Sequence, residues 1–264
     1  GTVEDAEAYM AWIKSQPLFE NIVFKIHYYH ENVFPRQVVK YRKQLVALDE
    51  KVDLSVTGKH ASPEEWKSLL ESSEKPVVLD IRNDYEWEVG RFKGAERPPC
   101  KTFRDFMQYT EELKKTVNPN APVMMYCTGG IRCELYSSVL LNGGFKNVYQ
   151  LDGGVINYGL KQGSEHWLGK LFVFDDRLTV PISNEETEVI GKCFHCQSPI
   201  ENYYNCASMD CNELFLCCEP CLKQFDGCCS TECKNNTSRV RPFAHQNPHK
   251  PFRRWYEYFK EKRN

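Results

Sequence analysis

A glycine-containing segment that begins with a cysteine and has an arginine near its end is the part of this sequence best suited to chemistry. An apolar run at 123–126 predicts a buried strand before the segment, and a helix is predicted after it, over 134–141. A glycine-bearing turn at a helix N-terminus points backbone N–H groups inward and forms a nest for an anion. Together with Arg132, this nest should lower the pKa of the Cys127 thiol and favour the reactive thiolate. The alternative is an inert, buried cysteine at a strand end. The segment consists of Cys127, Thr128, Gly129, Gly130, Ile131, Arg132 and Cys133.

A second group of cysteines has the spacing of metal ligands. Most of the 13 cysteines lie between Cys193 and Cys233, and eight of them form four short-spaced pairs. Four such pairs fit two tetrahedral zinc sites with thiolate ligands, and Cys217 and Cys228 are spare or alternative ligands. The sequence does not assign which pairs share an ion. An iron–sulfur cluster, reduced cysteines and disulfides are the alternatives. The predicted ligands are Cys193, Cys196, Cys206, Cys211, Cys218, Cys221, Cys229 and Cys233.

The elements that must position Cys127 alternate along the middle of the chain. Apolar runs at 77–81, 123–126 and 147–151 predict buried strands, and an amphipathic helix is predicted over 103–113. This alternation predicts an α/β fold with a parallel sheet flanked by helices. In such sheets reactive groups lie at the carboxyl ends of the strands, which is where Cys127 falls.

The sequence predicts three domains, at 1–55, 56–161 and 162–264. Ser62 is a predicted N-cap at the start of the second, with Glu65 completing a capping box. The first domain is predicted as a small α+β unit, with a helix over 3–13 and strands over 22–28 and 38–46. The chain begins at Gly1 rather than at methionine, which indicates a fragment of a longer protein.

Composition limits the possible classes of protein. The net charge of −2 over 264 residues gives no global argument for a nucleic-acid partner. No apolar run approaches the roughly 20 residues of a membrane span. An odd number of cysteines at metal-like spacings suits a reducing compartment, so a cytoplasmic location is expected.

The last 30 or so residues form a basic, aromatic tail. From Lys234 onward, lysines and arginines far outnumber acids and alternate with aromatic residues such as Trp255. Basic groups neutralise phosphates and aromatic rings stack on unpaired bases, so the tail is a candidate RNA-binding segment. A solvated tail whose rings pack back on the body is the alternative. Lys40, Arg42 and Lys43 form a second candidate patch.

Three ordered motifs in the second domain resemble those of the rhodanese family. They are the stretch from Asp80 and Arg82 through Glu86 and Gly90 to Gly94-Ala95, the loop from Cys127 to Arg132, and the closing Asp152-Gly153-Gly154. Cys133 stands where the family usually has serine or threonine. With the cysteine-rich block that follows, this substitution resembles one branch, the bacterial tRNA uridine(34) hydroxylases.

The resemblance implies an oxygen-dependent enzyme that forms 5-hydroxyuridine at the wobble position, with the anticodon region of tRNA as its partner. It also implies a ferredoxin-like or acylphosphatase-like domain before the rhodanese domain, and the first unit here looks like the second half of one. Cys127 would be the catalytic nucleophile and carry a persulfide. Arg132 would orient the loop or screen its charge.

Other roles remain open. Cys133 either resolves an oxidised Cys127 or is a small buried residue, and Asp80 with Arg82 is expected to form an ion pair under the site. No spacing fits a two-histidine-one-carboxylate iron site, and no flavin or nicotinamide site is evident. Two alternative functions are a sulfurtransferase that moves persulfide sulfur and a zinc-stabilised, non-catalytic adaptor.

Overall fold

The computed structural model describes residues 2–26, 28–30, 33–34, 39–46 and 52–236. The chain divides into two compact units, Gly1–Lys40 and Tyr41–Asn264. The predicted basic tail lies outside the described residues from 237 onward. None of the described helices combines the length and the apolar composition that a membrane-spanning helix requires.

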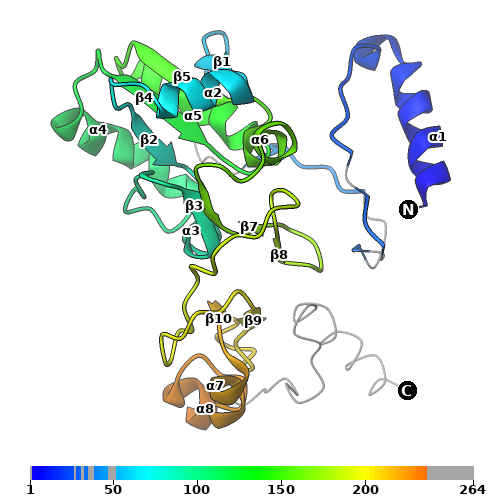
Figure 1. Cartoon of the computed structure of the whole chain (residues 1–264), viewed down its shortest axis with the longest axis vertical. Helices are drawn as coiled ribbons and strands as arrows, with labels where there is room; N and C mark the ends of the chain where they lie inside the picture. The colour runs from blue at the N-terminus through cyan, green and yellow to red at the C-terminus, as the bar shows by residue number, and fades with distance from the viewer. Residues whose placement is uncertain (1, 27, 31–32, 35–38, 47–51, 237–264) are drawn as a thin grey trace. The chain divides into compact units, whose positions relative to one another are not determined.

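The larger unit contains a four-stranded parallel sheet (Figure 1). Its strands run in the order β1-β5-β4-β2, and Val123 of β4 lies opposite Val77 of β2 and Val148 of β5. The three apolar runs predicted as strands are confirmed, and so is their parallel arrangement. The strands are β1 (Lys59–Ala61), β2 (Val77–Asp80), β4 (Pro122–Tyr126) and β5 (Asn147–Leu151).

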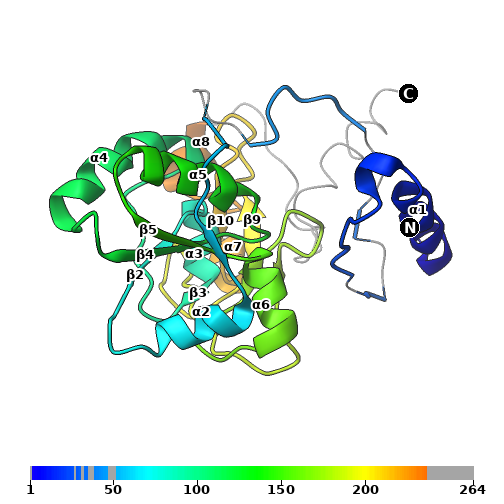
Figure 2. The same ribbon diagram turned by 90° about the horizontal axis from the view of Figure 1, so that it is seen from above.

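Helices cover both faces of this sheet (Figure 2). One core joins the sheet to α4 and α5 around Phe106, Tyr136 and Leu140, and a second joins it to α2 and α6 around Trp66 and Tyr158. Burial of these large side chains accounts for the layered arrangement. The four helices are α2 (Pro63–Leu70), α4 (Phe106–Thr116), α5 (Ile131–Asn142) and α6 (Gly154–Gln162).

The predicted helix starts agree with the structure in most details. The Ser62 side chain accepts a hydrogen bond from the Glu65 backbone N–H at 3.1 Å, and the Glu65 carboxylate accepts one from the Ser62 backbone at 3.0 Å. The helix predicted over 103–113 begins as a 3₁₀ turn, η2 (Phe103–Asp105), before α4 continues to Thr116.

Short elements connect the sheet to the cysteine-rich region. Helix α3 (Asp84–Val89) leads into β3 (Gly90–Phe92), which pairs with β6 (Trp167–Gly169). Next come the paired strands β7 (Leu171–Phe172) and β8 (Thr179–Val180). These elements place α3 between the sheet and the cysteine-rich region.

The cysteine-rich region is built on one antiparallel hairpin, β9 (Tyr203–Asn205) with β10 (Leu214–Leu216). Two short helices follow, α7 (Glu219–Gln224) and α8 (Thr231–Asn236). Tyr203 and Leu216 of the hairpin pack against Val89 and Phe172, and the Tyr203 hydroxyl donates a hydrogen bond to the Tyr85 carbonyl. The hairpin is therefore fixed against α3 by a shared apolar core.

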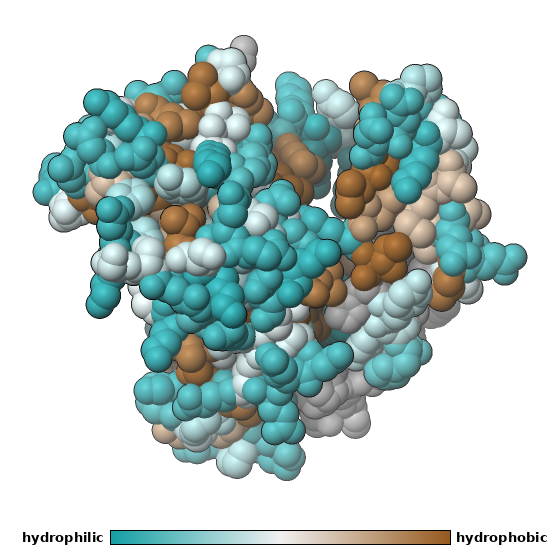
Figure 3. Space-filling view, turned by 45° about the horizontal axis from the view of Figure 1, so that its top comes forward, coloured by the Kyte–Doolittle hydropathy of each residue, from teal (hydrophilic) through white to brown (hydrophobic). Residues whose placement is uncertain are grey.

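The smaller unit contains the predicted N-terminal helix, α1 (Val3–Lys14), and a 3₁₀ turn, η1 (Pro17–Phe19). The strands predicted over 22–28 and 38–46 are wrong for the residues that the structure describes in them, because 22–26 and 39–46 form no strand. A strand needs a hydrogen-bonded neighbour and one buried face. Val23 is 86% exposed and Val39 is 91% exposed. Figure 3 shows hydrophobic side chains reaching the surface around α1.

Candidate active site and metal centres

Cys127 follows the last residue of β4, and three residues separate it from the first turn of α5. Its Sγ accepts a hydrogen bond from the Gly130 backbone N–H at 3.1 Å. Gly130 is the N-cap of α5 and has a φ of 96°, a left-handed conformation that favours glycine. This turn aims the positive end of α5 at the sulfur, so the loop forms the predicted anion nest.

The thiol of Cys127 is the group most affected by this environment. Burial alone would raise its pKa, because Cys127 is only 1% exposed. A hydrogen bond from the Cys133 side chain, the charge of Arg132 and the backbone N–H groups of Cys133 and Gly130 outweigh burial and lower the pKa to about 5. Cys127 is therefore a thiolate at neutral pH, the nucleophilic form.

We predict that the thiolate at Cys127 titrates near pH 5. The absorbance of thiolates at 240 nm would be measured against pH for the wild type and for Cys127→Ala, and the difference between the two curves isolates this one group. Its midpoint should lie more than three pH units below the ~8.5 of an ordinary cysteine. A midpoint at pH 8 or above would show that burial, and not the nest, controls the thiol.

Arg132 forms a two-pronged ion pair with Glu86 of α3. Its guanidinium nitrogens donate to the two carboxylate oxygens at 2.6 and 2.8 Å, and Glu86 is fully buried. Burial would raise the pKa of Glu86, but the pair with Arg132 lowers it below its usual range. The Thr128 hydroxyl also donates to Glu86, at 2.9 Å. The loop is thus tied at Thr128 and Arg132 to one carboxylate that the sequence analysis did not name as a site residue.

Replacement of that carboxylate should destabilise the fold. Glu86→Gln leaves the buried Arg132 guanidinium without its countercharge, which we expect to cost about 3 kcal/mol. Glu111→Gln is the matched control, since it removes an exposed pair with Lys114 worth under ~1 kcal/mol. Thermal unfolding of both variants measures the difference. Equal melting temperatures for the two would contradict a structural role for the Arg132–Glu86 pair.

Asp80 and Arg82 form a buried ion pair below the loop. The Arg82 Nε and Nη2 donate to the Asp80 carboxylate at 2.9 and 2.5 Å, and Nη2 also donates to the Gly90 carbonyl at 2.6 Å. The Tyr126 hydroxyl donates to the same carboxylate at 2.6 Å. The pair therefore joins the ends of β2 and β4 to the start of β3, beneath the residue that precedes Cys127.

Two glycines at the start of α6 allow the loop to sit close to the sheet. Gly154 has a φ of 67°, and a Cβ there would lie 2.6 Å from the Cys127 carbonyl oxygen. The following backbone N–H groups, of Val155 and Ile156, donate to the carbonyls of Cys127 and Thr128 at 3.0 and 3.2 Å. The second glycine pair thus cradles the reactive segment from the other side. In the segment from Cys127 to Cys133, the Ile131 side chain is 52% exposed and therefore reaches the surface.

Cys133 is completely buried in the first turn of α5. Burial, and next its hydrogen bond to Cys127, raise the pKa of its thiol well above the ordinary value. A protonated Cys133 next to a thiolate Cys127 is a hydrogen-bond donor to it, as serine or threonine would be at the same position. None of the 13 cysteines is in a disulfide.

The eight predicted metal ligands form two separate groups of four. Their sulfurs lie within 4.8 Å of one another in each group, and the pairs interleave along the chain. Cys217 and Cys228, the spare thiols, are buried outside both groups. The first group is Cys193, Cys196, Cys218 and Cys221, and the second is Cys206, Cys211, Cys229 and Cys233.

The geometry of both groups fits a tetrahedral metal ion. Sulfurs held at ~2.3 Å from zinc lie about 3.8 Å apart. The Sγ atoms of Cys196 and Cys218 are 3.6 Å apart, and those of Cys229 and Cys233 are 3.8 Å apart. These separations are far longer than the ~2.05 Å of a disulfide. The β9–β10 hairpin explains which cysteines share a group. The group with Cys206 and Cys211 lies at the hairpin's tip, and the group with Cys193 and Cys218 lies at its open end.

Two family models match this part of the chain. Residues 62–160 match the family model of the rhodanese-like domain, and residues 168–234 match that of the rhodanase C-terminal region. A rhodanese-like domain protein from Staphylococcus aureus is 24% identical, with a TM-score of 0.33, over 38% of this chain and 91% of that one. The sheet, the cysteine loop and the glycine pair define a rhodanese-like protein.

Two curated relatives narrow the class. The tRNA uridine(34) hydroxylase of Protochlamydia amoebophila (strain UWE25) is 67% identical over 262 residues, which are 99% of this chain and 82% of the relative. The tRNA uridine(34) hydroxylase of Chlamydia felis (strain Fe/C-56) is 56% identical over 97% of this chain and 79% of the relative. The chain belongs to the tRNA uridine(34) hydroxylase family.

Proposed function

We propose that this chain hydroxylates the wobble uridine, position 34, of tRNA to 5-hydroxyuridine, with molecular oxygen as co-substrate and an external two-electron reductant that converts the second oxygen atom to water. The observation that carries the proposal is the Cys127 thiolate nest within a chain that is 67% identical, over nearly its whole length, to a tRNA uridine(34) hydroxylase. The proposal also includes a cytoplasmic location, where the tRNA substrate and reduced thiols are found.

In this proposal Cys127 is the catalytic nucleophile and carries a persulfide. The Gly130 N–H group and the positive end of α5 would stabilise the negative charge of the terminal sulfur. Arg132 sets the shape of the loop through Glu86 and adds positive charge beside the sulfur. Cys133 donates a hydrogen bond to the charged sulfur, and Thr128, Gly129 and Ile131 complete the anion-binding segment.

Asp80 and Arg82 are assigned a supporting role. Their ion pair is fully buried, so it contacts no substrate and instead holds the strand ends that carry the loop. This buried network would keep the loop in one geometry as the charge on Cys127 changes.

We propose structural zinc at each four-cysteine group. Two ions of this kind would stabilise a region that has only one short hairpin and two short helices as regular structure. We also propose domains at 1–55, 56–161 and 162–264, of which the first belongs to a ferredoxin-like or acylphosphatase-like unit. The large exposed apolar side chains of that first segment support such a unit, because they need a partner surface.

The chemistry of the loop also suits a sulfurtransferase, because a nest that stabilises a persulfide can hand its sulfur to an acceptor. A strain that lacks its own wobble-uridine hydroxylases would be supplied with this chain, and its tRNA nucleosides analysed by mass spectrometry. Restored 5-hydroxyuridine derivatives are the expected result. Restored thionucleosides without hydroxylation would replace the proposal with sulfur transfer, and no change in either would support the non-catalytic adaptor.

A further inference from the structure

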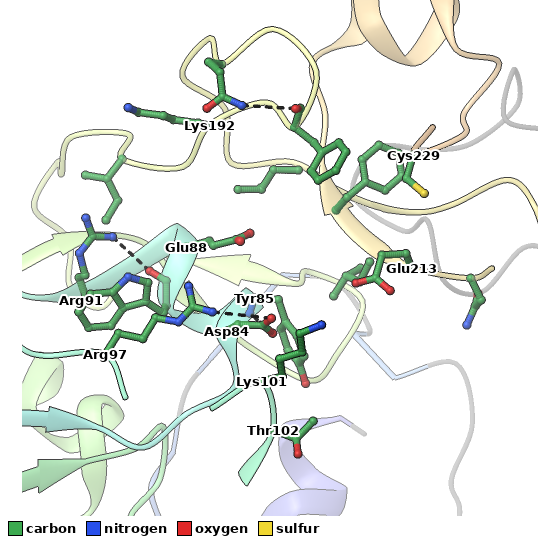
Figure 4. A pocket seen from close by; sticks show the side chains of 18 residues that line it. Asp84, Tyr85, Glu88, Arg91, Arg97, Lys101, Thr102, Lys192, Glu213 and Cys229 are labelled. Atoms are coloured by element: carbon green, nitrogen blue, oxygen red, sulfur yellow. Dashed lines mark hydrogen bonds and ion pairs between the residues drawn. The ribbon is translucent and has the colours of Figure 1, made fainter. Parts of the chain in front are cut away.

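A large pocket lies between α3 and the cysteine-rich region, away from the residues assigned to catalysis. Its volume is about 820 Å³, and its walls come from α3, the segment that follows β3, and both ends of the β9–β10 hairpin (Figure 4). Because the hairpin and α3 share one apolar core, these walls keep a fixed spacing. The pocket is therefore a built feature of the larger unit.

Four cationic side chains from separate segments line this pocket. Arg91 and Arg97 come from the sheet side, and Figure 4 shows Lys192 across the pocket from Arg97 and Lys101. Arg97 pairs with Asp84 at 3.8 Å, whereas no carboxylate of the described residues forms an ion pair with Lys101 or Lys192. Both lysines are exposed. Unpaired cations on opposing walls are suited to phosphate groups that pass between them.

The other lining groups are not those of a site for a simple polyanion. Glu88 lies between the cationic walls, and burial with the nearby charges of Asp84 and Glu213 raises the pKa of its carboxyl group. Carboxylates repel a plain polyphosphate but accept hydrogen bonds from the amino groups of nucleobases. Two rings supply stacking surfaces, Phe194, which is 60% exposed, and Trp87, on which Arg91 already stacks at 4.8 Å.

We propose that this pocket binds a single-stranded segment of the tRNA substrate, a few nucleotides away from the uridine that reacts. The cations would contact its phosphates, the rings would stack on a base, and Glu88 or Glu213 would accept a hydrogen bond from that base. The inference rests on the proposed function, since it assigns the pocket to the same substrate.

The position of α3 supports binding of the reacting uridine at the Cys127 loop and of another base in the pocket. Glu86 of α3 binds Arg132 of the catalytic loop, while its neighbours Tyr85, Trp87 and Glu88 line the pocket. One helix therefore separates the two sites, and a helix with its side chains is about 10–12 Å across. At ~3.4 Å per stacked nucleotide, a strand would cross that distance in about three to four nucleotides. An anticodon loop that presents its wobble base to Cys127 would thus reach the pocket with a base about three to four nucleotides away.

The test compares two double variants with the same change of net charge. Lys101→Glu with Lys192→Glu reverses the unpaired cations of the pocket, and Lys115→Glu with Lys146→Glu reverses two exposed lysines outside it. The full chain of each would be titrated with unmodified tRNA transcript by fluorescence anisotropy at several salt concentrations. Circular dichroism checks that each variant is folded.

We expect the pocket variant to bind tRNA about 10- to 100-fold more weakly than the wild type. Its plot of log affinity against log salt should also be shallower by about two. The control variant should stay within about threefold of the wild type. Equal weakening in both variants, or none in either while the wild type still binds and hydroxylates tRNA, would overturn the pocket assignment alone. A wild type that neither binds tRNA nor forms 5-hydroxyuridine would instead refute the proposed function.

Discussion

Cys127→Ala should abolish 5-hydroxyuridine formation in cells that depend on this chain for it. The variant removes the only thiolate that the nest stabilises, and loss of a catalytic nucleophile reduces rates by on the order of 10³-fold or more. The measurement is nucleoside mass spectrometry of total tRNA. The variant is also expected to fold, because the loss of one small buried side chain should cost only about 1 kcal/mol of stability.

Cys100→Ala is the matched control for this prediction. Cys100 is also a buried thiol of the same domain, but burial and nearby acidic groups raise its pKa to about 12, so it stays protonated. Its removal should leave hydroxylation close to the wild-type level. Full hydroxylation by Cys127→Ala, or equal losses in both variants, would mean that the loop thiol has no special role.

The second large effect is expected on zinc content and unfolding temperature, when Cys218 but not its neighbour Cys217 is replaced. Cys218 belongs to the first four-cysteine group, whereas Cys217 is buried outside both groups. With zinc at each group, the wild type should contain two ions per chain. Cys218→Ser should contain about one and should unfold at a markedly lower temperature, because metal binding contributes folding free energy in small domains. Cys217→Ser should retain both ions.

Elemental analysis of freshly isolated protein distinguishes the possible outcomes. Zinc at a ratio of two per chain, lost selectively in Cys218→Ser, supports the assignment. Iron in place of zinc would favour the iron–sulfur alternative, for which thiolates are also the usual ligands. Absence of both metals would leave only reduced cysteines.

Much of the sheet and the loop could be predicted because their sequence patterns are local. The apolar runs at 77–81 and 123–126 form the buried strands β2 and β4, and the glycines after Cys127 lead directly into helix α5. Strand β1 was missed, since Lys59–Ala61 is three residues long and becomes a strand only by pairing with β5, about 90 residues later. The predicted strands of the first unit failed for the converse reason, as their side chains favour strands but find no partner strand among the described residues.

Contacts between distant segments account for what the sequence did not reveal about the site. Glu86 is part of the motif that begins at Asp80, but its partner Arg132 lies 46 residues away and meets it only in the folded chain. The pairing of the cysteines has a similar origin. The antiparallel hairpin carries Cys206 and Cys211 at its tip and brings Cys218 beside Cys193 at its open end, so ligand pairs alternate between the two groups.

The most direct test of the whole account follows the oxygen atom. Cells that depend on this chain for wobble hydroxylation would be grown briefly under ¹⁸O₂, with either the wild type or Cys127→Ala, and their tRNA nucleosides analysed by mass spectrometry. The account predicts ¹⁸O in the 5-hydroxyl group of uridine with the wild type and no 5-hydroxyuridine with the variant. Hydroxylation that persists without the Cys127 thiol, or a hydroxyl oxygen that carries no label, would contradict it.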